Sequence, residues 1–238
     1  MTISVALFDL DDTLFAHRKS VRDGFAAHIA QHVPGADPAT ELDRWDELEE
    51  THYSRYLTGE LSYLGQRHAR VRDFVEPHGL SFTLDADAEE WFETYRVEYR
   101  RAWTLYDDTL PCLDALDALG VRIGLISNGI HDFQMAKLDA LDLTRRIEHI
   151  VLSGEFGAAK PDPSIFLHAC VAFGVEPSSA VYIGDRLHTD AIGAARAGLT
   201  GVWLDREWAA SAAELGEARA AGARVIHSLS QLPALIAR

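Results

Sequence analysis

The sequence predicts an α/β protein: a Rossmann-like core built on a parallel sheet, with an inserted domain of four helices. Two observations predict this fold. From about residue 104 onward, short apolar runs alternate with segments of helical length, and strands joined by helical crossovers form parallel sheets. A single apolar run at residues 5–8 precedes a long stretch with helical spacing only. Because one strand has no partner by itself, it must join the later sheet, which makes the helical stretch an insertion.

The first strand ends in a cluster of acids. Residues 5–8 are apolar without alternation, as in a strand buried on both faces, and Asp9, Asp11, Asp12 and Thr13 follow. Open α/β sheets bind ligands at the carboxyl ends of their strands, and neighbouring carboxylates repel one another unless a cation lies among them. A helix N-cap is the alternative, but one acid would suffice for it.

The next segment, residues 16–103, has no strand pattern. Apolar residues recur at helical spacing over 21–33, 38–56, 61–75 and 85–99, with Pro and Gly between the segments. Four amphipathic helices of this kind form a unit of their own, in which most aromatic residues are expected to pack against one another. The predicted division is therefore a core of 1–15 and 104–238 and a helical domain of 16–103.

The remaining strands each end in a polar residue. Strands are predicted at 121–126, 147–152, 181–183, 201–204 and 224–227, and helices at 130–141, 163–173, 189–197 and 209–221. Ser127 and Asn128 follow one strand, Asp185 follows another, and Lys160 precedes Pro161 in a strand-to-helix loop. Asp190 begins the helix after Asp185. Because parallel strands end along one edge of a sheet, these side chains are expected to converge with Asp9 and Asp11.

Composition narrows the classes of partner. The formal net charge is −15, with 37 acidic and 22 basic residues, which disfavours binding to nucleic acid or to an anionic membrane surface. No apolar run is long enough for a membrane span, and the N-terminus lacks the basic region of a signal peptide. The sequence predicts a cytoplasmic protein and leaves a monomer and a dimer equally open. Cys112 and Cys170 are expected to be buried.

Four motifs in order resemble those of the haloacid dehalogenase-like hydrolase superfamily, in particular its phosphatases. They are Phe-Asp-Leu-Asp-Asp-Thr-Leu at 8–14, Ile-Ser-Asn-Gly at 126–129, Lys-Pro-Asp at 160–162, and Gly-Asp-Arg-Leu-His-Thr-Asp at 184–190. The resemblance covers nearly the whole chain. The residues in and around the motifs are similar to those of nucleotidase-like and N-acylneuraminate-9-phosphatase-like members. It implies that residues 16–103 are a cap domain over the active site.

The resemblance also implies the chemistry. Asp9 would attack phosphorus and form an aspartyl phosphate, and Asp11 would protonate the leaving oxygen and later accept a proton from water. Mg²⁺ would bind the Asp9 carboxylate, the Asp11 carbonyl and Asp185, with Asp190 as a further ligand or as a group that orients waters and Lys160.

The same resemblance implies a binding site for the phosphoryl group. Ser127, Asn128 and Lys160 would bind its oxygens. The implied substrate is a small phosphorylated metabolite, such as a sugar phosphate or a nucleoside monophosphate. Because substrate choice depends on the interior of the cap, the sequence does not select among these.

Four other activities compete with hydrolysis of a phosphate ester. A phosphomutase would share every core motif and differ in the cap. A 2-haloacid dehalogenase would need Asp9 but no acid at Asp11, because halide leaves without protonation. Phosphonate cleavage would need a Schiff-base lysine in the cap, where Lys19 is the only lysine. A phospho-accepting receiver module also uses an acid pair with Ser and Lys, but it is about half this length and has no helical insertion.

Overall fold

The computed structural model describes residues 3–237. The chain divides into two compact units: His17–Trp103 forms one, and the segments up to Ala16 and from Thr104 onward form the other.

The larger unit contains a parallel sheet of six strands in the order β3-β2-β1-β4-β5-β6. The strands are β1 (Val5–Phe8), β2 (Arg122–Ser127), β3 (His149–Leu152), β4 (Ala180–Gly184), β5 (Thr200–Leu204) and β6 (Arg224–Ile226). The first strand lies in the middle of the sheet, with Phe8 opposite Leu125 of β2 and Ile183 of β4. The predicted fold class is confirmed, and the acids that follow β1 lie between the carboxyl ends of β2 and β4.

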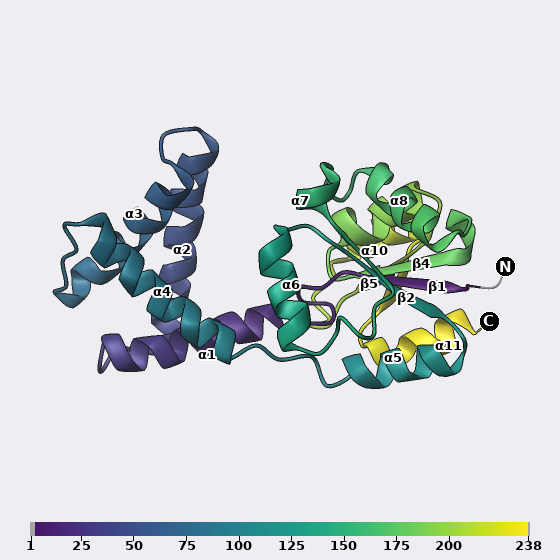
Figure 1. Ribbon diagram of the computed structural model, residues 1–238, viewed down its shortest axis with the longest axis horizontal. Coiled ribbons are helices and arrows are strands. Elements are labelled where there is room, and N and C mark those ends of the chain that lie inside the picture. Colours follow the sequence, from purple (N-terminus) through teal and green to yellow (C-terminus); the bar gives the residue numbers. More distant parts are fainter. Residues whose placement is uncertain (1–2, 238) are drawn as a thin grey trace. The chain divides into compact units, whose positions relative to one another are not determined.

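Helices cover both faces of this sheet, with α5 and α11 along one side and α8 along the other (Figure 1). The helices are α5 (Thr109–Ala118), α6 (His131–Ala140), α7 (Ser153–Phe156), α8 (Pro163–Phe173), α9 (Gly193–Arg196), α10 (Ala212–Ala220) and α11 (Leu232–Ile236). On the α8 side, Val5 and Leu7 of β1 share a buried cluster with Phe166 and Phe173. Burial on both faces explains why the strands are apolar without alternation.

Two predicted helices differ from those observed. The segment predicted as a helix over 189–197 is a π-helical turn, Leu187–Ile192, followed by α9, a distortion common near functional sites. The helix predicted over 209–221 begins later, because Ser211 caps α10 and exchanges hydrogen bonds with Glu214. The short α7 and α11 were not predicted, since one or two turns carry too few residues to show a period.

The smaller unit contains α1 (His17–His32), α2 (Pro38–Leu57), α3 (Tyr63–Val75) and α4 (Asp85–Arg101). N-cap residues precede two of these helices. The Asp37 side chain accepts from the Thr40 N–H before α2, and the Ser62 side chain accepts from the Gly65 N–H before α3. The unit is centred on Trp45, which is fully buried and whose ring lies 5.5 Å from that of Phe25 and 5.2 Å from that of Phe74. These aromatic residues therefore form a core, as predicted.

Two smaller expectations can be checked over the same residues. Between residues 3 and 237, no helix has the length and apolar character needed to span a membrane. Cys112 and Cys170 are buried free thiols, as expected.

Candidate active site

Lys160 is the centre of the site at the carboxyl edge of the sheet. Its Nζ lies 2.6 Å from Asp9 Oδ1, 2.7 Å from Asp190 Oδ1 and 2.6 Å from the Tyr182 hydroxyl oxygen. The side chain is only 2% exposed. A lysine ammonium has three hydrogens to donate, so these three partners hold it in one place.

The charges of this group depend on one another. Burial by itself would lower the pKa of Lys160, but the carboxylates of Asp9 and Asp190 outweigh it and hold that pKa above its ordinary value. Burial raises the pKa of Asp9 to about 8, against the attraction of Lys160, and the nearby Asp190 and Asp11 add to the rise. An additional positive charge at this site would favour the ionised form of Asp9.

Three carboxylates could hold such a charge. One oxygen each of Asp9, Asp185 and Asp190 lies within 4.8 Å of the others, and clustered carboxylates are the ligands that a hard divalent cation prefers. Asp190 uses both oxygens within the protein, because Oδ2 also accepts from the Arg186 N–H at 2.9 Å. A Cβ at Gly184 would lie 2.3 Å from Asp190 Cγ, so the glycine at this position allows the approach.

The residues at the end of β2 have distinct surroundings. Ser127 is buried, and its Oγ accepts from Gln134 Nε2 at 2.8 Å. The Asn128 side chain donates to the Lys160 carbonyl at 3.0 Å and accepts from the Lys160 N–H at 2.9 Å. The amide of Asn128 therefore fastens the loop that carries Lys160.

The two remaining acids point to different partners. Asp11 receives hydrogen bonds from two residues of α6, Lys137 at 2.5 Å and Gln134 at 3.0 Å. Asp12 instead accepts from the Tyr106 hydroxyl at 3.2 Å. All the residues predicted for the site thus lie at the same edge of the sheet, as the strand-end argument requires.

Sequence reasoning missed Tyr182, Gln134 and Lys137. Tyr182 was recognised only as a strand residue, and nothing local marks its hydroxyl as a partner for Lys160. The spacing of Gln134 and Lys137 was a usable signal, because residues three apart on a helix share a face. The sequence has three lysines, and two of them contact the acids that follow β1.

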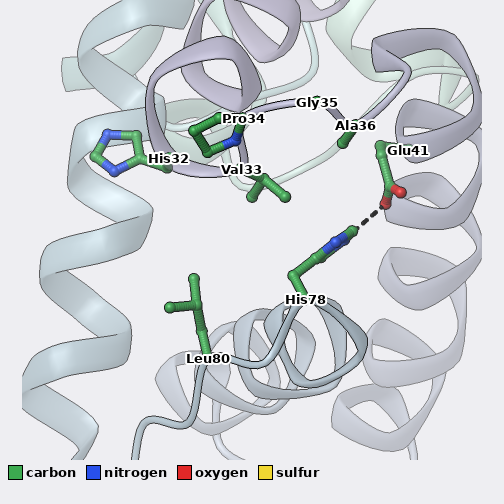
Figure 2. Close-up of a pocket in the computed structure, with 8 residues that line it drawn as sticks. All are labelled: His32, Val33, Pro34, Gly35, Ala36, Glu41, His78 and Leu80. Atoms are coloured by element: carbon green, nitrogen blue, oxygen red, sulfur yellow. Dashed lines mark hydrogen bonds and ion pairs between the residues drawn. The ribbon is translucent and has the colours of Figure 1, made fainter.

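A hollow lies within the helical unit (Figure 2). Its volume is about 470 Å³, and it is lined by His32, Val33, Pro34, Gly35, Ala36, Glu41, His78 and Leu80. The carboxylate of Glu41 is paired with His78 at 3.1 Å. None of the residues predicted for the active site lines it.

Most of the chain matches a known protein family. The family model described as haloacid dehalogenase-like hydrolase matches residues 3–198, which include all four motifs. The chain belongs to the haloacid dehalogenase-like hydrolases. The resemblance noted from the motifs is therefore confirmed.

Two relatives of this hydrolase are named as phosphatases. Phosphoserine phosphatase from Thermus thermophilus is 31% identical over 223 residues, covering 86% of this chain and 89% of that protein. Glyceraldehyde 3-phosphate phosphatase from Methanopyrus kandleri is 31% identical over 212 residues, covering 86% of this chain and 84% of that protein.

Solved structures share the fold over the full length. The magnesium-bound HAD-hydrolase YfnB from Bacillus subtilis has a TM-score of 0.76 at 18% identity, covering 99% of each chain. The 2-haloacid dehalogenase from Pseudomonas syringae has a TM-score of 0.65 at 27% identity, covering 100% of this chain and 99% of that one. The fold alone therefore does not exclude dehalogenation, because a 2-haloacid dehalogenase shares it.

Proposed function

We propose that this hydrolase is a magnesium-dependent phosphomonoesterase that acts on a small phosphorylated metabolite through an aspartyl phosphate. One observation carries the proposal: the buried Asp9 carboxylate at the end of the central strand is held by Lys160, with Asp185 and Asp190 beside it. The two relatives named as phosphatases support the same activity.

The donor set suits Mg²⁺. Asp9 and Asp185 would bind it with their carboxylates and Asp11 with its backbone carbonyl, whereas Asp190 would hold Lys160 and the loop after β4. When bound, the cation would balance the charge between Asp9 and the phosphoryl oxygens and favour ionised Asp9.

The residues of this chain would then divide the chemistry between them. An oxygen of Asp9 forms a bond to phosphorus as the bond to the leaving oxygen breaks, and Asp11 gives that oxygen its proton. Water next attacks phosphorus, the bond to Asp9 breaks, and Asp11 takes a proton from the water. Ser127 binds a phosphoryl oxygen, and Lys160 binds another by exchanging one of its three hydrogen bonds within the protein for it. Asn128 contributes by fastening the Lys160 loop.

The helical unit would act as the cap and choose the substrate. It follows directly after the Asp9–Asp12 stretch in the sequence, so its placement can control access to that stretch and exclude water. A phosphomutase would use the same core residues. Dehalogenation is disfavoured because Asp11 has no role when halide leaves.

The first experiment measures phosphate release from a panel of phosphorylated metabolites with Mg²⁺, with Asp9→Asn measured in parallel. We expect release from a few related compounds and a loss of at least about 10³-fold in kcat in Asp9→Asn, because an amide is a poor nucleophile. Asp114→Asn, an exposed position, is the control and should retain full activity.

Three outcomes would change the proposal. Activity of Asp9→Asn within a few-fold of wild type would contradict the aspartyl-phosphate mechanism. Full activity in excess chelator would contradict the metal assignment. Release from none of the compounds would favour the phosphomutase, for which isomerised sugar phosphates are then sought.

A further inference from the structure

Two residues on a buried face of α6 donate hydrogen bonds to the Asp11 carboxylate. Lys137 Nζ lies 2.5 Å from Oδ1, and Gln134 Nε2 lies 3.0 Å from Oδ2. The two donors are three residues apart, so they project from one side of the helix. Each oxygen of Asp11 thus has its own partner, and the plane of the carboxyl group is defined.

Burying the Lys137 ammonium costs free energy, and specific partners offset that cost. Its side chain is 3% exposed, whereas that of Asp11 is 29% exposed. Removing an ammonium from water carries a large penalty unless partners replace the water. The replacements are the Asp11 carboxylate and the rings of Phe15 and Phe133, whose centroids lie 5.2 and 4.7 Å from Nζ.

Gln134 links Asp11 to the predicted phosphate-binding serine. The same Nε2 donates to Ser127 Oγ at 2.8 Å. Because that hydroxyl oxygen accepts from Gln134, its own hydrogen is directed to another acceptor. A Cβ at Gly129 would lie 2.8 Å from Gln134 Nε2, so the glycine of this motif leaves room for the amide.

We propose that Lys137 and Gln134 are positioning residues for Asp11, which hold its carboxyl group where it can exchange a proton with the leaving oxygen. This inference rests on the proposed phosphomonoesterase function. Each carboxyl oxygen accepts one hydrogen bond from α6, so the two donors together fix the orientation of the group that exchanges the proton. Proton transfer demands this accuracy, because a displacement of about 1 Å can reduce a rate about 10²-fold.

The test compares two aryl phosphates, phenyl phosphate and 4-nitrophenyl phosphate. Phenolate is the poorer leaving group and depends more on a proton from Asp11. In Lys137→Met we expect kcat/KM for phenyl phosphate to fall about 10- to 100-fold, because misplacing the general acid loses part of its contribution of about 10²- to 10⁴-fold. That for 4-nitrophenyl phosphate should change less than about threefold. Gln134→Leu should shift the ratio in the same direction.

Two variants serve as controls. Lys137→Arg keeps a cationic donor and should restore most of the activity on phenyl phosphate. Arg145→Met removes the same charge from an exposed ion pair, where the arginine side chain is 80% exposed, and should leave both substrates unaffected. A merely structural role of Lys137 would lower both activities equally.

The outcomes separate this inference from the function on which it rests. Equal loss on both esters, or no loss on either, in the presence of an active wild type overturns the positioning role alone. If the wild type releases phosphate from none of the esters, the proposed function is overturned and this inference with it. If only metabolites are hydrolysed, Lys137→Met must lose its effect in an Asp11→Asn background, and an undiminished effect there overturns the inference.

Discussion

At the scale of single residues, two buried cations are organised in opposite ways. Lys160 is surrounded by Asp9, Asp190 and Tyr182, so its charge is shared among several groups of the site. Lys137 is directed to Asp11. Asp9 is therefore paired with Lys160 and Asp11 with Lys137, so the two acids have different environments. Two carboxylates with different roles in catalysis require such a difference.

A third buried residue, His28, makes the stability of the helical unit dependent on pH. It is fully buried, and neither ring nitrogen has a partner within the described part of the chain. Burial, with a contribution from nearby His32, lowers its pKa from 6.5 to about 3. The unfolded chain therefore binds this proton at a higher pH than the folded one. The stabilising contribution is complete above pH 6.5 and is lost as the pH falls toward 3.

We therefore expect the free energy of unfolding to fall between pH 6.5 and 4, and to fall less steeply in His28→Phe, which cannot titrate. Urea unfolding followed by tryptophan fluorescence measures this, since Trp91 lies against the imidazole with ring centroids 4.2 Å apart. His188→Phe, at an exposed position outside the helical unit, controls for the introduction of a phenylalanine. Identical slopes for wild type and His28→Phe would contradict the expectation.

At the scale of elements, close approach of two helices depends on one glycine. Gly24 of α1 is buried, and a Cβ there would lie 2.5 Å from Tyr99 Cα of α4. Backbone atoms cannot move aside as a side chain can, so α1 and α4 must separate to admit a methyl group. This is a helix contact that residue periodicity does not reveal.

Gly24→Ala should destabilise the helical unit by about 1–3 kcal/mol, because the strain of overpacking exceeds the gain in helix propensity. Gly216→Ala is the matched control: Gly216 lies within α10, and a Cβ there would contact nothing within 4 Å. The control should stabilise the protein by about 0.5–1 kcal/mol. Denaturant unfolding compares the two, and a stabilising Gly24→Ala would refute the packing argument.

At the scale of the whole molecule, the chain leaves the sheet unit after Ala16 and returns to it at Thr104, and the Ala16 N–H donates to the Thr104 carbonyl at 3.0 Å. The helical unit begins and ends at adjacent points. It also has an apolar core of its own around Trp45. Both properties are those of an inserted domain that can fold alone.

Residues 17–103 expressed alone should fold cooperatively, because the buried rings around Trp45 all come from this segment. Circular dichroism should report helix, and urea should unfold it in one transition. Trp45→Ala in the same fragment should lose about 3–5 kcal/mol and with it the cooperative transition. A disordered wild-type fragment would show that the helical unit depends on the sheet unit.

Much of the fold and of the candidate site was predictable because the signals are local. Apolar runs mark the buried strands, helical spacing marks α1 to α4, and polar residues mark the strand ends. Parallel strands end at one edge, so Asp9, Lys160 and Asp185 could be brought together without coordinates. The π-helical turn at Leu187–Ile192 could not be predicted in this way, because its six residues show no period that separates it from an α-helix.

The α/β class and the order of motifs that identifies the family follow from the amino-acid sequence alone, since both depend on periodicity and on residues adjacent in the chain. Which polar and charged groups pair with one another became evident only from the tertiary structure. Tyr182 contacts Lys160, Asn128 fastens its loop, and Lys137 reaches Asp11. These partners are far apart in the chain and meet through side-chain direction and helix packing, which no local pattern records.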